Sequence, residues 1–373
     1  MQKRDFLIAF NLIPHIQSKT IFELIKQLDD ISDIKKLKKS DLLNYSGIGE
    51  KTADKIAGFD FERRLQNELK KAEKQNVKII TKLDDDYPYL LKNIDYQPLV
   101  LYIKGELPSD EDVSISIVGT RRPTTYGKVA GSKIAADLAG AGVTITSGLA
   151  RGIDSIAHKA ALNAGGKTVA VLGSGLDIIY PPEHRRLYSK IIESGAAITE
   201  FPFATKPERN NFPIRNRIIS GISIGTLIVE ASEKSGTLIT AKYAIEQGRE
   251  LFAVPGNITS RQSIGTNYLI KNGARLVQRA DDIIDELPDN LRQKITEKKG
   301  PDSLEDDECQ QENDLDEMEK KILSVLEFDK PQHVDVVCAI LKEQPHNMWQ
   351  HLLALEMKNA VLQLEGKMFI RKM

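Results

Sequence analysis

Cysteine is scarce in this chain of 373 residues, which contains only Cys309 and Cys338. Two distant cysteines fit a reducing compartment, so we expect a cytoplasmic protein without a disulfide framework or a thiolate metal cage. The 6 histidines do not fall at ligand spacing beside carboxylates or thiols, and we therefore expect no metal site. No run of about twenty apolar residues is present, which argues against a membrane span, and the N-terminal apolar run is too short and interrupted for a signal peptide.

The chain also lacks an excess of either charge. Its 52 Lys and Arg residues and 53 Asp and Glu residues give a net charge of -1. Bulk charge therefore does not attract polyanions, and any anion site must come from a local cluster. The hydrophobic content of 41% is enough for sizeable cores, and the length predicts two or three domains.

Composition changes along the chain predict the domain boundaries. The pattern of residues 1–76 is typical of short, lysine-rich helices, and we predict a helical domain there. A bridging stretch with Tyr-Pro and Gln-Pro steps follows, for which we predict extended chain and turns. Residues 77–287 form the predicted main domain, with a core at 113–277. Residues 288–314 are nearly free of apolar side chains and acidic in their second half, which predicts a flexible linker.

The last segment, residues 315–373, regains an amphipathic helical pattern. It ends in VLQLEGKMFIRKM, which predicts a hairpin-like pair of short strands around Glu365 and Gly366. Three helices and a hairpin suggest a small winged-helix module.

Six short β-branched runs alternate with Ala-rich helical stretches in the main domain. The runs are SISIVG, GVTITSG, TVAVLGSG, AAITE, GTLIVEA and ELFAVPG. They are almost continuously apolar, as expected for strands buried on both faces of a parallel sheet. The intervening stretches are long enough for crossover helices. The pattern predicts a doubly wound, Rossmann-like α/β domain.

The segment LLNYSGIGEKTADKI in the first domain predicts two helices joined by a tight turn. Gly47 and Gly49 would let the backbone approach a phosphate, Ile48 would pack the turn, and Lys51 would add positive charge. The pattern resembles a helix-hairpin-helix motif that holds DNA by its backbone. The alternative is a glycine-stapled turn without a ligand. An earlier segment has the same rhythm, but His15 and Gln17 stand where glycines would be needed.

Polar, glycine-containing loops follow several predicted strands. In doubly wound sheets ligands bind at the carboxyl ends of the strands, where free backbone amides, hydroxyls and an arginine suit a phosphate. A tight strand-to-helix turn without a ligand is the alternative for each single loop. The loop residues predicted to bind an anion are Gly119, Thr120, Arg121, Gly173, Ser174, Gly175, Ser235, Gly236 and Thr237.

A second basic segment reads FATKPERNNFPIRNRIIS. Positions two apart on a helix point to different sides, so we predict that either Arg215 or Arg217 faces the ligand groove while the other pairs internally, for instance with Glu230 or Asp154. Internal struts at both positions are the alternative. The other predicted ligand contacts of this segment are Lys206, Arg209, Asn216 and Phe212, whose ring is available to stack on a base.

Nucleotide and catalytic motifs are incomplete. GGKT lacks the earlier glycine of a phosphate-binding loop, and GSGLDI does not complete G-x-G-x-x-G. Ser147 and Ser174 do not sit in G-x-S-x-G. For Asp154, Asp177 and Glu230 we favour helix capping or pairing with the arginines. We therefore predict no cofactor and no catalytic residue.

The assembled motifs resemble the DNA-processing protein A (DprA/Smf) family. They are SIVGTRRPTTYG, TSGLARGIDSIAH, AVLGSGLDIIYPPEHRRLY, FPIRNRIISGIS, SGTLITAKYAIEQGRELFAVPG and GTNYLIKNGA. The resemblance implies a homodimeric binder of single-stranded DNA that protects incoming strands, loads the RecA recombinase during natural transformation and catalyses no reaction. A single-strand-binding protein is a further implied partner. By motif, Arg121, Gly173 to Gly175 and the FPIRNR arginines would line one DNA groove, with Lys206 or Arg209 at its rim.

Two other functions are compatible with parts of the sequence. The α/β pattern also resembles nucleoside-monophosphate phosphoribohydrolases, but EKSGTLITA lacks the Pro-Gly-Gly and the glutamate of their loop. Release of base from AMP would identify such an enzyme. The third alternative is an adaptor whose C-terminal module grips a partner, which deletion of that module would reveal.

Overall fold

The computed structural model describes residues 1–373 apart from positions 15, 17, 29, 111, 300–314, 328–329, 359, 365 and 372–373. The predictions made for His15, Gln17, Cys309, Glu365 and the linker residues 300–314 lie outside the described residues. Among the described helices, none combines the length and apolar character needed to cross a bilayer. The described side chains also include no group of three or more His, Cys, Asp or Glu arranged around a metal site.

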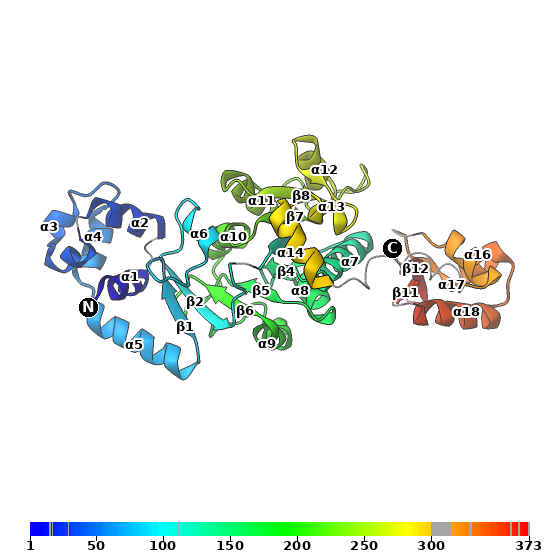
Figure 1. Cartoon of the computed structure of the whole chain (residues 1–373), viewed down its shortest axis with the longest axis horizontal. Helices are drawn as coiled ribbons and strands as arrows, with labels where there is room; N and C mark the ends of the chain where they lie inside the picture. Colours follow the sequence, from blue (N-terminus) through cyan, green and yellow to red (C-terminus); the bar gives the residue numbers. More distant parts are fainter. Residues whose placement is uncertain are drawn as a thin grey trace.

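A nine-stranded sheet lies at the centre of the molecule, in the order β1-β2-β6-β5-β4-β3-β7-β8-β9 (Figure 1). Strands β3 to β9 are parallel to one another, whereas β2 pairs antiparallel with β6 and with β1. The predicted doubly wound α/β fold is therefore confirmed, and all six predicted strands are present. The strands are β1 Lys78–Thr81, β2 Val100–Gly105, β3 Ser114–Val118, β4 Thr144–Ser147, β5 Thr168–Val171, β6 Ala196–Thr199, β7 Gly225–Ile228, β8 Glu250–Ala253 and β9 Arg275–Leu276.

Helices cover both faces of the sheet because the strands carry apolar side chains on both faces. One face packs on α6, α10, α11 and α12, through residues such as Val118, Val171 and Ile228. The other face packs on α7, α8 and α13 in the centre and on α9 near β6. These helices are α6 Tyr89–Lys92, α7 Thr125–Gly140, α8 Ile153–Asn163, α9 Arg185–Ser194, α10 Asn211–Gly221, α11 Thr237–Glu246, α12 Ile264–Lys271 and α13 Asp281–Ile284.

The direction in which successive strands are added to the sheet reverses between β3 and β7. Crossovers from β3 run outward through β4 and β5 to β6, whereas those from β7 run the other way through β8 to β9. Loops after β3 and β7 therefore diverge and leave a crevice at the carboxyl ends of these strands, which is where ligands bind in this architecture.

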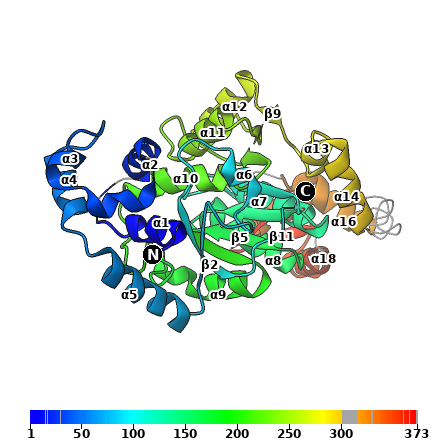
Figure 2. The ribbon, with the colours of Figure 1, turned by 60° about the vertical axis from the view of Figure 1, so that its left-hand side comes forward.

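The N-terminal helices share a hydrophobic core with the sheet. Phe10, Leu65 and other helix residues join the cluster that includes Tyr102 and Leu172 of the sheet region. The bridging stretch, predicted as extended chain and turns, contains strand β2, which pairs antiparallel with β1 at the sheet edge. Figures 1 and 2 show these helices beside that edge. They are α1 Lys3–Asn11, α2 Ser18–Gln27, the 3-10 helix η1 Ile31–Lys36, α3 Lys39–Leu42, α4 Glu50–Ala57 and α5 Phe61–Lys74.

The predicted two-helix turn is present between α3 and α4. Gly47 has φ of +82°, in the left-handed region that favours glycine, and Gly49 caps the N-terminus of α4. Ile48 is buried and packs the turn.

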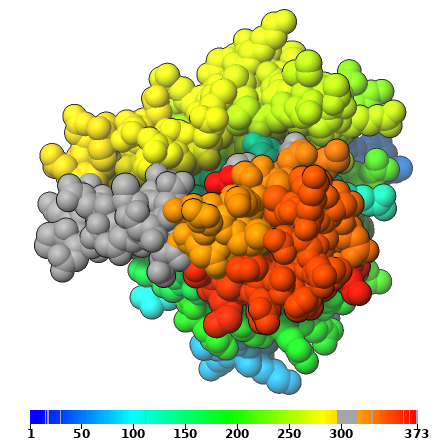
Figure 3. All heavy atoms as spheres, turned by 90° about the vertical axis from the view of Figure 1, so that its right-hand side faces the viewer, coloured from blue at the N-terminus to red at the C-terminus, as the bar shows by residue number. Residues whose placement is uncertain are grey.

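The C-terminal residues form the predicted winged helix. Its three helices pack around Met348, Leu352 and Phe369, and its small sheet has the order β10-β12-β11. Figure 3 views the molecule from this end, with the module in orange and red. The elements are α16 Glu317–Val325, β10 Gln332–His333, α17 Val334–Leu341, α18 Pro345–Met357, β11 Val361–Leu364 and β12 Met368–Arg371.

Part of the predicted flexible linker is helical. Residues Asp289–Lys299 form α14, so the prediction of a linker starting at residue 288 is wrong for this part. The physical reason is Ile295, one of the few apolar side chains in the segment, which is buried against the core beside α7 and α8. Burying one such side chain stabilises the helix by about 1.5–3 kcal/mol.

Candidate functional site

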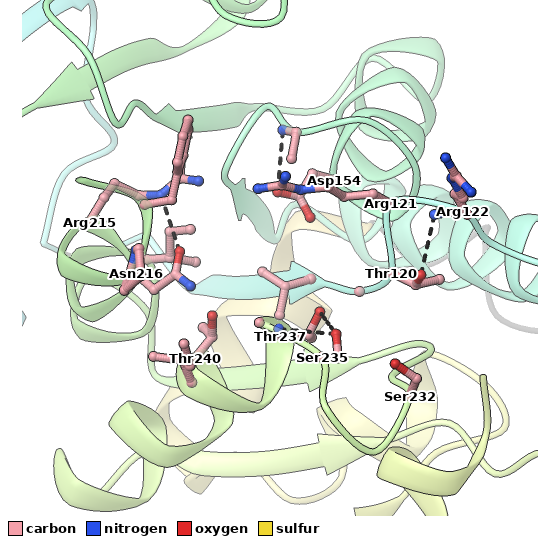
Figure 4. A pocket seen from close by; sticks show the side chains of 18 of the residues that line it. Thr120, Arg121, Arg122, Asp154, Arg215, Asn216, Ser232, Ser235, Thr237 and Thr240 are labelled. Carbon is pink, nitrogen blue, oxygen red and sulfur yellow. Dashed lines mark hydrogen bonds between the residues drawn. The ribbon is translucent and has the colours of Figure 1, made fainter. Parts of the chain in front are cut away.

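A crevice of about 860 Å³ opens at the switch point between β3 and β7. Its walls come from the loop after β3, the start of α8, the first half of α10 and the loop that leads into α11 (Figure 4). Helix α10 begins at Asn211 and carries Phe212, Arg215 and Asn216 into the wall, since these positions share the side of the helix that faces the crevice.

Positive charge dominates the lining of the crevice. One acidic side chain, Asp154, stands against five basic ones among the described lining residues. The whole chain has a net charge of -1, so the charge that an anion would meet is concentrated here and not spread over the surface. The five basic residues are Arg121, Arg122, Arg209, Arg215 and Lys234.

Arg121 and Arg209 are exposed, and no ion pair joins either one to a described acidic residue. Arg121 lies in the loop between β3 and α7, where it follows Gly119 and Thr120. The amide of Thr120 donates to the carbonyl of Glu230 at 2.8 Å, which ties this turn to the end of β7. Both guanidinium groups are therefore available to an external anion.

Arg215 is held at the base of the crevice by the ends of neighbouring strands. Its guanidinium donates to the carbonyl of Gly148 at 2.7 Å and also to the carbonyl of Val171. Burial lowers the pKa of Arg215 to about 10, against the opposing charge of nearby Asp154. Burial also raises the pKa of Asp154, and the positive charge of Arg215 acts in the other direction. The two groups partly neutralise each other beneath the exposed arginines.

Arg217 does not line the crevice. Its guanidinium binds the carboxylate of Glu200 with two hydrogen bonds, of 2.5 and 2.8 Å, and both side chains are buried. The prediction that one of the two arginines pairs internally is thus correct, but the partner is Glu200, not Glu230 or Asp154. Glu200 directly follows β6. The sequence spacing did not reveal that β6 and α10 lie close together. Arg217 therefore takes the internal role of the two arginines, and its position outside the crevice gives no support to the predicted ligand contact.

Phe212 forms the aromatic part of the crevice. The guanidinium carbon of Arg121 lies 5.6 Å and that of Arg215 lies 5.9 Å from the centre of its ring. The ring of Tyr180 is 5.7 Å away, at a tilt of 44°. Arginines around an aromatic ring form a surface on which a flat base can stack beside a bound phosphate.

The start of α11 forms the opposite wall. Gly236 caps the helix, and the hydroxyl of Ser235 accepts from the amide of Thr237 at 3.2 Å. Ser235, Gly236 and Thr237 all line the crevice, as the sequence predicted. The positive end of the helix dipole adds to the charge of the arginines.

Several predicted residues lie away from the crevice. Ser174 is buried and donates to the carbonyl of Ile178 at 2.7 Å, while Gly175 packs against the backbone of Pro202. Gly173 packs so close to the ring of Phe212 that a Cβ atom at this position would lie 2.9 Å from it. The loop after β5 therefore lies beside the aromatic ring and outside the crevice lining, and direct DNA contacts from these three residues stay a prediction.

Two groups of predicted contacts stand outside the crevice lining. Lys206 is exposed one residue before Pro207, which does line it. Gly47, Gly49 and Lys51 are exposed on the N-terminal helices, and their part in a DNA contact stays a prediction.

Two acidic side chains at strand ends accept hydrogen bonds from backbone amides, in line with the structural role predicted for them. Glu230 accepts from the amide and the hydroxyl of Thr124, at 2.9 and 2.5 Å, where α7 begins. Asp177 accepts from the amide of Ala204 at 2.9 Å. These contacts fix the loops around the crevice.

Sequence reasoning missed some crevice residues. Arg122 and Lys234 stand next to predicted residues in the same motifs, so their proximity was the available signal. Tyr180 and Gln262 reach the crevice from loops after β5 and β8 that no local pattern connected with it.

The fold and the crevice define a class: doubly wound α/β proteins with a basic crevice at the switch point of the sheet. Within this class, the family described as DNA recombination-mediator protein A matches residues 78–288, and the DprA winged helix domain matches residues 306–367. The chain belongs to the DNA recombination-mediator protein A (DprA/Smf) family, which confirms the resemblance seen in the sequence.

Relatives of known sequence or structure agree with this assignment. Protein Smf of Synechocystis sp. is 37% identical over 289 residues, which cover 76% of this chain and 73% of the relative. The structure of DprA from Streptococcus pneumoniae matches with a TM-score of 0.66 and 32% identity, over 77% of this chain and 99% of the other. The structure of DNA processing protein A from Helicobacter pylori, described with a single-stranded DNA binding mode, matches with a TM-score of 0.50 and 29% identity, over 56% of this chain and 94% of the other.

Proposed function

We propose that this protein binds single-stranded DNA in the crevice between β3 and β7 and acts as a DNA-processing protein in natural transformation. The observation that carries the proposal is the charge of the crevice, which is lined by five basic side chains and one buried acidic side chain among the described residues. Such a surplus needs an anionic ligand of matching length, and a sugar-phosphate chain supplies one charge for each nucleotide. The relative from H. pylori, with its reported single-stranded DNA binding mode, supports the same choice.

The aromatic ring favours a single strand over a duplex. Phe212 lines the crevice beside Arg121, so a base that stacks on it would place its phosphate near the guanidinium. Bases in a duplex are already stacked and paired and cannot reach the ring. Phosphate contacts with Arg121, Arg209 and the amides at the start of α11 carry no sequence information, so we expect little sequence preference.

We propose binding without catalysis. Asp154 is the single acidic residue of the described lining, and it is buried beside Arg215. A pair of carboxyl groups acting as general acid and general base would require a second acidic side chain, and the described lining contains none besides Asp154. The crevice is therefore suited to hold a strand and not to cleave one.

The partners remain those that the family suggests. We propose that the protein protects the strand, delivers it to RecA, and also meets single-strand-binding protein on it. We further propose a homodimer. Exposed apolar side chains at the β9 edge of the sheet support it, namely Ile245, Ile264, Tyr268 and Leu276, with 61%, 43%, 62% and 48% of their surface exposed.

Fluorescence anisotropy with labelled single- and double-stranded oligonucleotides, over a salt series, tests the DNA proposal. We expect tighter binding of the single strand and weaker binding by Arg121→Ala, by about 1–3 kcal/mol or roughly 5- to 150-fold. The slope of log affinity against log salt should fall by about 0.7 for one lost phosphate contact. Arg186→Ala, an exposed arginine on α9 outside the crevice, is the control and should change neither value.

Two results would contradict the proposal. Equal affinity for single and double strands would remove the role of the aromatic ring. Unchanged affinity of Arg121→Ala, combined with a lower melting temperature, would make Arg121 a structural strut.

A further inference from the structure

A group of lysines surrounds two aromatic rings between α2 and the sheet. Lys19, Phe22 and Lys26 occupy positions i, i+3 and i+7 of α2, so they share one face of that helix. The Lys26 ammonium lies 4.5 Å from the centre of the Phe22 ring, and that of Lys82, which follows β1, lies 5.1 Å from it. The Lys19 ammonium lies 4.5 Å from the ring of Tyr96. We call these three lysines with Phe22 and Tyr96 the lysine–aromatic cluster.

The lysines of this cluster lack ion pairs within the part of the chain that the structure describes. Nearby acids are engaged elsewhere: Asp84 binds Arg4 at 3.0 Å, and Asp86 pairs with Lys78. Glu23 is one turn from Lys19 on α2 without forming an ion pair with it, and Asp95 is exposed beside Tyr96.

The positive charges of the cluster repel one another. Lys82 is half-buried, and burial followed by the charge of Lys26 lowers its pKa. Cation–π contacts offset part of this repulsion but leave the net charge in place. An anion between the ammonium groups would remove the repulsion.

Tyr96 is held in a strained backbone conformation. Its φ is +51°, a value that is an outlier for a bulky side chain and costs about 1–3 kcal/mol. The guanidinium of Arg217 donates to the carbonyl of Tyr96 at 3.1 Å and fixes this conformation. The strained backbone directs the ring toward Phe22, at a centroid distance of 5.9 Å. Strain of this kind persists only where the surrounding structure holds it, and it clusters at active sites and ligand clamps.

Helix α10 connects the cluster with the crevice. It presents Arg215 and Asn216 to the crevice, and Arg217, one residue later, reaches the Tyr96 carbonyl. Tyr96 links the two helices, because its ring faces Phe22 of α2 and its carbonyl accepts from Arg217 of α10. A strand that leaves the crevice past α10 thus has a second positive, aromatic surface within its course.

We propose that the lysine–aromatic cluster is a second contact for the backbone of the same DNA strand, outside the crevice. The proposal rests on the proposed function. Lys26 and Lys82 hold one or two phosphates, and the rings of Phe22 and Tyr96 offer a stacking surface for an unpaired base. The N-terminal helices thereby lengthen the binding site that the α/β domain begins.

The test compares a short oligonucleotide of about six thymidines, which the crevice alone can hold, with one of about 25. We expect Lys26→Ala/Lys82→Ala to weaken binding of the long strand by about 5- to 30-fold and to lower its salt slope by about 1.4, for two lost phosphates. Binding of the short strand should not change. Lys70→Ala/Lys74→Ala, two exposed lysines one turn apart on α5, is the matched control and should leave both strands unaffected.

A melting curve separates a structural role from a binding role. Removing Lys26 and Lys82 relieves repulsion, so we expect a melting temperature that is unchanged or higher. A lower melting temperature with unchanged DNA affinity would make the cluster a structural clamp and overturn the proposal. Equal losses for the short and the long strand would also overturn it, because the lysines would then act on the crevice. If the wild-type protein binds neither strand, the proposed function itself fails, which is a distinct result.

Discussion

The pair formed by Arg217 and Glu200 offers a quantitative test of how α10 is held. Both side chains are nearly inaccessible, with 6% and 3% of their surface exposed, and their closest atoms are 2.5 Å apart. Arg217→Met removes the positive partner and leaves the Glu200 carboxylate buried without its counter-charge. Breaking a buried ion pair in this way costs about 3–5 kcal/mol.

This loss is large enough for calorimetry. With a shift of about 2–4 °C for each kcal/mol in a domain of this size, the melting temperature should fall by roughly 6–20 °C. Replacing both residues by methionine should recover much of the loss, because no unpaired charge stays buried. At temperatures well below the transition, affinity for a short single strand should be unchanged, since Arg217 is outside the crevice.

An exposed pair of the same geometry provides the control. Arg151 and Glu183 are also 2.5 Å apart, but 57% and 49% of their side-chain surfaces are exposed. Arg151→Met should therefore cost no more than about 1 kcal/mol. Equal effects of the two arginine variants would refute the reasoning, because burial and not distance is the basis of the predicted difference. An Arg217→Met protein as stable as wild type would refute it as well.

Two further predictions concern acid stability and assembly. Burial, followed by the charges of His184 and Arg215, lowers the pKa of His158 to about 3. The unfolded chain, with a pKa near 6.5, takes up the proton first, so stability is lost as pH falls below about 6.5, by up to ~1.4 kcal/mol for each pH unit. Urea titrations at pH 6.5 and 5 should show a smaller loss for His158→Leu than for wild type, and parallel losses would contradict this assignment. In sedimentation velocity we expect a wild-type dimer and a Tyr268→Glu monomer, with Leu353→Glu on the winged helix as the control; a monomeric wild type would exclude the dimer.

The sequence predicted the parts of the fold that depend on local pattern. Continuous apolar runs identified β3 to β8, because a strand buried on both faces has no polar alternation. The turn at Gly47 was recognisable from its glycines, and the winged helix from its amphipathic helical pattern and the two short strands at its end. Strands β1 and β2 were missed, since their pairing depends on the distant strand β6 and not on their own residues. The helix after residue 288 was missed because one isoleucine stabilises it through a tertiary contact.

The candidate site likewise contains residues that local sequence pattern predicted and residues whose position depends on tertiary packing. Arg121 and Ser235 follow strands or begin helices, and the general rule for doubly wound sheets placed them at one edge. The different fates of Arg215 and Arg217 could not be assigned, because Glu200 becomes the partner of Arg217 only after β6 has packed near α10. Ser174 was predicted as a contact from a glycine pattern that in the folded chain lies beside Phe212.

Glu200 has two roles, and together they connect the N-terminal helices with the α/β core. Its side chain anchors α10, and its carbonyl accepts from the side chain of Asn11, at 2.8 Å, on the first helix of the chain. Proteolysis near Asn76 would therefore not release an independently stable fragment. Separation of the two fragments would expose the apolar core that they share. The N-terminal helices and the α/β core should melt as a single cooperative unit, and a lesion in either is felt by both.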